Sequence, residues 1–574
     1  MVTDTTDETH RPAHHGAHRA ARDTDRVATV LAYVDAVRDR PRRSLDEEGF
    51  APDWADRPAP HTVHPGACEI PLPTATAARA TGTLAHALAR ATTGRRAVAP
   101  VPASGPATGL TLADFAAALQ LTAGVLARRW QIDWNGDADR RARLTGAAWG
   151  RGTPSGGANY PWELYWAAPP GLPVPPGLLH YAGGRHALER LSTGDPTPVV
   201  RAALAESPPP GAGAPTGGYL ICTLRPWKTA FKYGNFAHHV ATHDIGAFLG
   251  SWSLLRFAAD DPDGATARLA FDEPAVNALL GLDPDRESAY AVLPLTWHPA
   301  ERRAPRSGTL PPAGPASASP GRPRPRERSR RVRPIPAPAA LLRATQATPG
   351  PPPTAPRAAG PPVPTTLLPL PDAADRPADL AELLSRRRSS TGRFDPLADL
   401  AAPDLAAVLR CAAAATGAPD EGLLRIHVLV QRVEGIAPGA YRYLPARHAL
   451  APSGSGTPGL RERDYAMRNY SVAHAGAVVA LTWRPAPDLA AHGPHAHRRA
   501  HAEAGAAGQY LSLAAQALGL GCGLALGLDP RAVDAAVAGA GPSGGRGDDE
   551  LRTTLCAFLG TRMPGTADLD DRLL

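Results

Sequence analysis

Two windows of 18 residues in this 574-residue chain repeat one another without a gap, and this repeat constrains the fold more than any other feature. Gly177–Gly194 reads GLLHYAGGRHALERLSTG, and Gly439–Gly456 reads GAYRYLPARHALAPSGSG. A second pair is RATTGR at residues 90–95 against RSSTGR at residues 388–393, each followed by a proline and a helical pattern. Self-similarity at matched positions predicts two copies of one structural unit.

A third pair shows that the two copies have diverged. KYGNFAHHVATHDIG (Lys232–Gly246) aligns with AHGPHAHRRAHAEAG (Ala491–Gly505), so the Lys-Tyr pair that opens the first window is Ala-His in the second. Only the second copy has Leu-Gly-Leu-Gly (residues 518–521) after its long helical pattern, and only the first has Pro-Ser-Gly-Gly (residues 154–157). We therefore expect the copies to hold complementary parts of one site.

Length and composition divide the chain into four parts. We expect a disordered tail over residues 1–25, a first folded unit over 26–300, a Pro/Arg-rich linker over 301–374 and a second folded unit over 375–574. The linker holds 12 arginines and two acidic residues before position 363, a local charge of +10 in a chain of formal charge +7. The remainder is slightly acidic, so no strongly basic face indicates nucleic-acid binding.

The spacing of apolar residues predicts the main elements of both units. Helices are predicted over residues 26–38, 82–91, 112–129, 378–387, 404–415 and 497–518, and strands over 163–166, 219–224, 425–431 and 477–483.

The cysteines and the N-terminus bear on the cellular compartment. The five cysteines are scattered and odd in number, which is typical of a reducing cytosol and of a chain without a disulfide framework or structural zinc. The N-terminus is polar and His-rich without the apolar core of a secretory signal, and no apolar run reaches membrane-spanning length. We therefore expect a cytoplasmic protein without a bound metal.

The order of these motifs resembles the SagB/ThcOx-type dehydrogenases of the nitroreductase superfamily. The resemblance rests on the Arg-x-Ser/Thr motif, Pro-Ser-Gly-Gly before a Glu-Leu-Tyr strand, Arg-His-Ala-Leu, Lys-Tyr-Gly and Leu-Gly-Leu-Gly, none diagnostic alone. It covers both units. It implies an α+β fold of two nitroreductase-like α/β/α domains, each an antiparallel-rich sheet flanked by helices, joined as an intramolecular pseudo-dimer.

The resemblance also implies an activity. Such enzymes bind FMN at a dimer interface and oxidise azoline rings in ribosomally made peptides to thiazoles or oxazoles. The expected partners are a modified precursor peptide and a cyclodehydratase. Two alternatives stay open: an NAD(P)H-dependent nitroreductase-like oxidoreductase acting on small quinones or nitro compounds, and a flavin-free pseudo-dimer that scaffolds a biosynthetic complex.

Site residues follow from the resemblance position by position. The implied FMN-binding residues are Arg388, Ser390 and Arg393 at the phosphate, Pro154, Ser155, Gly156 and Gly157 at the ring, and Gly519 and Gly521 near N5 and O4. Arginine and serine suit a phosphate through charge-assisted hydrogen bonds, and glycine lets backbone amides approach a ring. The implied catalytic residues are Lys232 and Tyr233, of which one acts as general base with a pKa lowered by burial or a nearby cation. The mirror-related site lacks several of these parts, and we expect it to be empty or weak.

Simpler explanations compete with some of these roles. Lys232 and Tyr233 could be an exposed lysine beside a packing tyrosine, and Arg386–Arg388 could be a solvated helix end. The Gly-x-Gly-x-Gly run from Gly519 follows a helix instead of opening one, so it is not a dinucleotide fingerprint.

Histidines and tryptophans are given structural roles. The three histidines at helical spacing, His495, His497 and His501, lack carboxylate or cysteine partners in sequence, so we expect a solvated face and no metal ligands. Trp162, Trp166 and Trp252 are expected in the core.

Overall fold

The computed structural model describes most of the chain, and the structural statements below concern only that part. The described residues are 11–74, 82–94, 109–133, 143–205, 216–302, 322–333, 335–346, 366–372, 378–389, 394–416, 422–453, 460–467, 469–538, 551–563 and 570–573.

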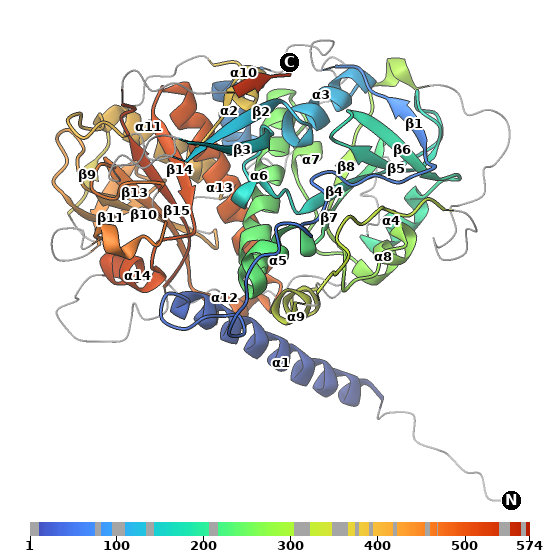
Figure 1. Ribbon diagram of the computed structural model, residues 1–574, viewed down its shortest axis with the longest axis horizontal. Coiled ribbons are helices and arrows are strands. Elements are labelled where there is room, and N and C mark those ends of the chain that lie inside the picture. Colours follow the sequence, from blue (N-terminus) through green and yellow to red (C-terminus); the bar gives the residue numbers. More distant parts are fainter. Residues whose placement is uncertain are drawn as a thin grey trace, which may run out of the picture.

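Two antiparallel sheets form the two halves of the molecule (Figure 1). The first has the order β1-β6-β5-β4-β7-β8 and the second the order β14-β15-β13-β10-β11-β12-β9. Read backwards, the second order repeats the first, with β14 added at one edge. The first sheet comprises β1 (Cys68–Pro71), β4 (Trp162–Ala168), β5 (Gly177–Ala182), β6 (Ala187–Ser192), β7 (Gly218–Leu224) and β8 (Ser288–Leu295). The second comprises β9 (Leu368–Pro369), β10 (Arg425–Val430), β11 (Gly439–Leu444), β12 (Ala449–Pro452), β13 (Ala477–Trp483), β14 (Gly521–Ala525) and β15 (Arg552–Gly560).

A small third sheet ties the end of the chain to the first half. It has the order β16-β2-β3, with β2 (Ala127–Asp133), β3 (Arg143–Gly150) and β16 (Asp570–Arg572). The C-terminal strand therefore crosses from the second half to pair with a strand of the first.

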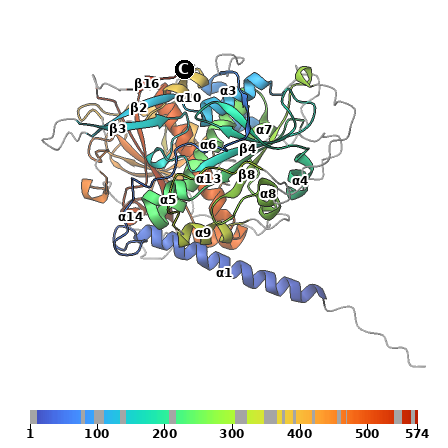
Figure 2. The same ribbon diagram turned by 45° about the vertical axis from the view of Figure 1, so that its right-hand side comes forward.

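Helices pack between and around the sheets. They are α1 (Arg11–Asp39), α2 (Leu84–Gly94), α3 (Leu112–Ala123), α4 (Thr197–Ala203), α5 (Trp227–Tyr233), α6 (Ala237–Ala258), α7 (Pro262–Ala265), α8 (Glu273–Leu280), α9 (Pro336–Ala344), α10 (Leu380–Arg386), α11 (Ala402–Ala414), α12 (Pro485–His492), α13 (Ala496–Ala517) and α14 (Pro530–Ala538). Figures 1 and 2 show α6 and α13 in the middle of the molecule, between the two main sheets. None of the described helices combines the length and the apolar character needed to cross a membrane.

The repeated window forms the same hairpin in both halves, and the histidine shared by the two copies contacts the equivalent tyrosine hydroxyl in each. In the first half Tyr181 Oη lies 2.9 Å from His186 Nδ1, and in the second half Tyr443 Oη lies 2.8 Å from His448 Nδ1. The other nitrogen of each ring faces a proline carbonyl beside the edge strand. In His186 this nitrogen therefore donates, and the Tyr181 hydroxyl donates to Nδ1. In His448 the same nitrogen also lies 3.1 Å from the Arg410 guanidinium. Both histidines sit at the turn with positive φ, 51° and 45°.

The two halves meet about a pseudo-twofold axis between α6 and α13. In the aligned windows Gly246 corresponds to Gly505, and a Cβ built on Gly505 would lie 2.8 Å from the Cα of Gly246. Likewise Thr242 Oγ1 lies 2.8 Å from Nδ1 of His501, its own counterpart. Contacts between equivalent residues are the signature of an isologous interface. The predicted α+β architecture of two repeated sheet-and-helix domains, joined as an intramolecular pseudo-dimer, is confirmed.

Three predictions about chain organisation differ from the structure. Helix α1 begins at Arg11, so the helical part of the N-terminus starts well before residue 26, and its Val30 is fully buried. The helix predicted over 112–129 ends at Ala123, and residues from Ala127 onward form β2. A helix stops there because the chain pairs with β3 instead.

The predicted linker is also partly ordered. Its segment 336–344 forms α9, which buries Leu341 and Leu342. Upstream, the backbone N–H of Arg326 donates to Val63 O over 2.9 Å, and Trp227 Nε1 donates to Ser329 Oγ over 2.9 Å. These contacts hold part of a Pro/Arg-rich stretch against the first half, which composition alone did not indicate.

Candidate active site

The Pro-Ser-Gly-Gly segment forms a strained turn between β3 and β4. Gly157 has φ 65°, and the next residues include Ala158 at φ 54° and Tyr160 at φ 47°. Left-handed backbone at non-glycine residues costs free energy and is retained where the surroundings hold it. Gly157 itself is exposed.

A buried carboxylate on α6 holds this turn. Ser155 Oγ donates to Asp244 Oδ2 over 2.6 Å, and the N–H of Gly156 donates to Asp244 Oδ1 over 2.9 Å. Burial raises the pKa of Asp244 to about 7, although the hydrogen bonds from Ser155 and Gly156 act in the opposite direction. The turn is thus fastened to the central helix of the first half.

Lys232 and Tyr233, at the end of α5, converge on Gly157. A Cβ added at Gly157 would lie 2.8 Å from Lys232 Nζ, 2.9 Å from Tyr233 Oη and 3.4 Å from Asn159 Nδ2. The Asn159 Nδ2 is buried without a hydrogen-bond partner. The Lys232 ammonium also lies 5.7 Å from the centroid of the Trp54 ring, and Trp54 is half exposed. An ammonium, a phenol and an unused amide therefore surround one glycine backbone at the surface.

The two titratable groups are shifted in opposite directions. Burial lowers the pKa of the Lys232 ammonium. Burial, followed by the nearby Asp244 carboxylate, raises the pKa of the Tyr233 phenol. Lysine loses its proton more easily than usual here and tyrosine less easily, so of the predicted pair Lys232 is the better general base.

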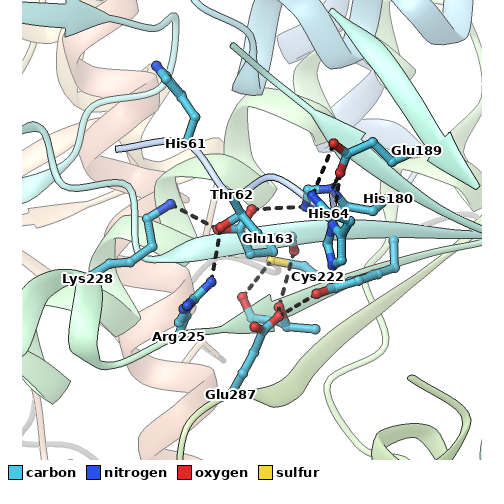
Figure 3. A network of polar contacts seen from close by, with 12 residues as sticks. His61, Thr62, His64, Glu163, His180, Glu189, Cys222, Arg225, Lys228 and Glu287 are labelled. Carbon is cyan, nitrogen blue, oxygen red and sulfur yellow. Dashed lines mark hydrogen bonds and ion pairs between the residues drawn. The ribbon is translucent and has the colours of Figure 1, made fainter. Parts of the chain in front are cut away.

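A buried polar network holds α5 against β4 (Figure 3). Lys228, one turn before Lys232, donates from Nζ to Glu163 Oε1 of β4 over 2.9 Å, and both side chains are buried. Glu163 also accepts from the Thr62 hydroxyl and from His180 Nε2, the latter over 3.2 Å. This anchoring fixes the position of the helix end that carries Lys232.

The second half reaches this region through Arg387, at the end of α10. Arg387 Nε donates to Gly152 O over 2.8 Å, two residues before Pro154, and Gln509 Nε2 of α13 donates to the same oxygen over 3.2 Å. Arg387 is only 2% exposed and interacts electrostatically with Tyr160 of the first half. The helix end that leads into the predicted phosphate motif therefore lies against the segment that leads into the turn.

The remaining predicted cofactor residues are placed as follows. Arg388 is half-buried next to Arg387, and Ser390 and Arg393 lie outside the described residues. Gly519 has φ 74° with open space around its missing side chain, as a ring approach would need. A Cβ built on Gly521 would lie 2.9 Å from the Phe394 ring, so packing within the second half explains why a glycine stands at this position.

The mirror-related region has a different arrangement. Arg90, the counterpart of Arg388, pairs with Asp260 at the end of α6, with Nε 2.8 Å from Oδ1. His86 Nε2 lies 3.2 Å from the same oxygen. A carboxylate next to this arginine competes with any phosphate.

Sequence reasoning missed Asp244, Asn159, Arg387 and Trp54. Arg387 stood within an arginine run that suggested a solvated helix end, but only Arg386 fits that description, paired with Glu382 on the surface. Asp244 and Trp54 carried no motif, because their contacts are with residues distant in sequence, and Asn159 lies two residues beyond the Pro-Ser-Gly-Gly motif.

The histidine and tryptophan predictions had different outcomes. His497 and His501 are 0% and 1% exposed, so the predicted solvated face is wrong; α13 is enclosed by α6 and the second sheet. The predicted core positions of Trp162, Trp166 and Trp252 are confirmed, each 1% exposed or less.

The described residues fit a flavin at this turn. An exposed glycine backbone without a side chain, an unpartnered buried amide and an arginine-bearing helix end from the other half are the kinds of group that a ring and a phosphate require.

Comparison with known proteins agrees with the fold. Residues 384–540 match the Nitroreductase family, which indicates an oxidoreductase domain in this part of the chain. A solved structure of a putative nitroreductase from Anabaena variabilis superposes with a TM-score of 0.64 at 20% identity, over 92% of this chain and 99% of that one. At this identity the likeness shows the fold alone. No curated protein matches the chain.

Two further structures match smaller parts. A putative nitroreductase from Ralstonia eutropha matches 37% of this chain and 97% of its own, at 20% identity and a TM-score of 0.26. The Escherichia coli microcin synthetase McbBCD complex with truncated pro-MccB17 matches over 30% of this chain and 69% of its own matched chain, at 16% identity and a TM-score of 0.26. Scores this low carry no argument about function.

Proposed function

We propose that this chain is an FMN-dependent dehydrogenase that oxidises thiazoline or oxazoline rings to thiazoles or oxazoles in a ribosomally synthesised peptide. The observation that carries the proposal is the convergence of Lys232 Nζ and Tyr233 Oη on the exposed backbone of Gly157. Azoline oxidation needs a general base beside an electron acceptor, and this arrangement offers the base at the turn where a flavin ring fits.

Different residues of the chain would bind the phosphate and the ring of FMN. Arg388, with Ser390 and Arg393, would hold the FMN phosphate, and the turn at residues 154–157 together with Asn159 and Gly519 would face the ring. Arg387 would keep the phosphate motif of the second half in register with the turn of the first. Bound FMN supplies the acceptor for the hydride and its two electrons that leave the azoline ring.

The protein's own side chains remove the proton that leaves the azoline ring. Lys232 Nζ, with its pKa lowered by burial, takes the proton from the ring carbon next to the one that loses hydride. Tyr233, with its pKa raised, stays protonated and orients the substrate by donating a hydrogen bond. Trp54 offers an exposed apolar ring 5.7 Å from the ammonium, on which the heterocycle and its neighbouring residues would pack.

The test uses the full chain reconstituted with FMN and a synthetic peptide that contains one thiazoline. The expected result is a loss of two hydrogens from the peptide, measured by mass spectrometry, together with oxygen consumption that depends on the peptide. Rapid bleaching of the flavin by NAD(P)H, without peptide oxidation, would support the small-molecule reductase instead. A chain that takes up no FMN would support the scaffold and overturn the proposal.

The partners follow from the same chemistry. The substrate ring is made by cyclodehydration of cysteine, serine or threonine in a precursor peptide, so a cyclodehydratase must act before this enzyme. We expect the two proteins to act on one peptide, and a pull-down with the modified precursor tests this association.

A further inference from the structure

Five histidine side chains meet where α6 and α13 cross. They are His238, His239, His243, His497 and His501, none more than 7% exposed. Neighbouring ring centroids lie between 3.9 and 5.7 Å apart. A neutral imidazole has one N–H and one nitrogen lone pair, and the lone pair can bind a metal ion.

The hydrogen bonds of three of these rings fix which nitrogen carries the proton. His239 Nε2 faces the Thr554 carbonyl at 2.9 Å, and His243 Nδ1 faces the His239 carbonyl at 2.6 Å. A carbonyl only accepts, so both of these nitrogens donate. His501 Nδ1 lies 2.8 Å from Thr242 Oγ1, whose hydroxyl is already directed at the His238 carbonyl, so Nδ1 donates there too.

The lone pairs therefore lie on His239 Nδ1, His243 Nε2 and His501 Nε2. One ligand nitrogen from each of these residues lies within 4.8 Å of those of the other two. Metal-binding histidines typically donate their second ring N–H to a carbonyl or hydroxyl, which fixes the tautomer and the ring orientation. All three rings already have such a partner.

We propose that His239, His243 and His501 bind one divalent transition-metal ion, with Zn²⁺ as the best fit to three neutral imidazoles. His239 and His243 are four residues apart and so share a face of α6, and His501 approaches from α13. Tetrahedral coordination needs nitrogens about 3.3 Å apart, so ion binding would require the rings to rotate from their present arrangement, in which the ligand atoms lie within 4.8 Å of one another. The Thr554 hydroxyl, 2.7 Å from His243 Nε2, turns away when the ion binds.

Two observations support an ion at this position. A small cavity beside the cluster is lined by His239, His501 and Thr554 together with Arg38, Asp534 and Arg552, and it has room for about one water as fourth ligand. His497, whose ring centroid is 3.9 Å from that of His501, has both ring nitrogens buried and unpartnered. Unpartnered buried nitrogens are costly, so a polar guest is favoured next to them.

The pseudo-twofold axis does not generate a second copy of the proposed site. The pseudo-twofold axis relates His239, His243 and His501 to Arg498, Ala502 and Thr242, which cannot form a second such set. An ion there would bridge the two central helices and so stabilise the pseudo-dimer.

A second histidine cluster in the described chain serves as a contrast. His64, His180 and Glu189 are equally close, but His180 faces carboxylates with both nitrogens, Glu189 at 2.9 Å and Glu163 at 3.2 Å. Burial alone would lower the pKa of His180, but these hydrogen bonds raise it to about 8. A protonated imidazole has no lone pair, so this cluster is an ion-pair network and not a metal site.

The test is metal binding by the untagged full chain in which His10, His14, His15 and His18 are all replaced by glutamine, because N-terminal histidines also bind metals. We expect one equivalent of Zn²⁺ after dialysis, measured by mass spectrometry of the metal. Co²⁺ in its place should give the visible absorption of a tetrahedral nitrogen site.

Variants decide whether the three named rings are the ligands. His243→Gln and His501→Gln should lose the bound ion, Thr242→Val should weaken it about 10–100-fold, and the buried neighbour His238→Gln should keep it. Absence of stoichiometric Zn²⁺, or equal affinity in the His243→Gln and His238→Gln proteins, would overturn the proposal. If the ligand variants do not fold, an absent Co²⁺ band in the protein with its ligands intact overturns it.

Discussion

Arg387 of the second half donates its Nε–H to the carbonyl oxygen of Gly152 of the first half over 2.8 Å. This bond links a helix end that leads into the predicted phosphate motif to the loop that leads into the Pro-Ser-Gly-Gly turn. Because the Arg387 guanidinium is buried, breaking this bond would leave a buried charge without this acceptor, which typically costs several kcal/mol, while Gly152 O would keep its hydrogen bond from Gln509. The two halves are thus held in register at the place where one flavin would need them.

Replacing Lys232 by alanine should leave flavin binding intact and lower turnover by about 10²–10⁴-fold, because the general base is lost. Flavin absorbance of the purified variant and peptide oxidation by mass spectrometry give the two readouts. Tyr233→Phe is the matched comparison and should retain more activity, since the phenol stays protonated. Unchanged turnover in Lys232→Ala would remove the residue from the mechanism.

The activity should rise with pH through the pKa of Lys232. Burial lowers this pKa below its ordinary value of 10.5, so the neutral amine becomes available at lower pH than for a solvated lysine. A kcat/KM profile that ascends with pH, and whose ascending limb moves to the pKa of the added amine when Lys232→Ala is rescued by a small amine, checks this. A profile that falls with pH would contradict the assignment.

Gly157→Ala should abolish turnover. An added methyl group would lie 2.8 Å from Lys232 Nζ and 2.9 Å from Tyr233 Oη, and a left-handed alanine costs about 1–2 kcal/mol besides. Gly66→Ala is the control, since Gly66 also has positive φ, 81°, but open space around it. Both variants share the backbone strain, so a difference in turnover between them measures the crowding at the site.

Arg388→Ala should lose the flavin, because a phosphate held by charge-assisted bonds loses one of its cations. Arg386→Ala should keep it, since Arg386 is exposed and paired with Glu382 on the surface of α10. Equilibrium dialysis with FMN measures both affinities. Equal affinity in the two variants would place the phosphate elsewhere.

The FMN content should be one per chain and not two. In the mirror-related region Arg90 is paired with Asp260 at 2.8 Å, so a phosphate would meet a carboxylate there. Arg90→Ala should therefore leave the FMN stoichiometry unchanged, as measured by flavin absorbance against protein concentration. Two equivalents of FMN in the unmodified chain would show that the mirror-related site is functional.

The stability should fall above neutral pH through His180. Its pKa is about 8 in the folded chain against an ordinary 6.5, so its contribution is fully present below pH 6.5 and is lost as pH rises through 8. The expected loss is about 2 kcal/mol of unfolding free energy. Denaturant unfolding between pH 6.5 and 9 measures it as the difference from His180→Gln, in which this pH dependence should be absent.

Much of the architecture was determined by the sequence alone. The gapless repeat predicted two copies of one unit, and the histidine turn of each hairpin shows why: a tyrosine and a histidine five residues apart need only local spacing to meet. The sequence also shows that each copy lacks a motif that the other has, since the Lys-Tyr pair occurs only in the first copy and the Leu-Gly-Leu-Gly run only in the second.

Only the tertiary structure decided which groups meet across the chain. Lys232, Gly157 and Asp244 come from three separate segments, and Arg387 reaches Gly152 across 235 positions. Periodicity reports which residues are apolar on one face of a helix, but not what packs against the polar face. The histidines of α13 were expected in water for that reason, and the close crossing of two glycine-bearing helices placed them at the centre of the molecule.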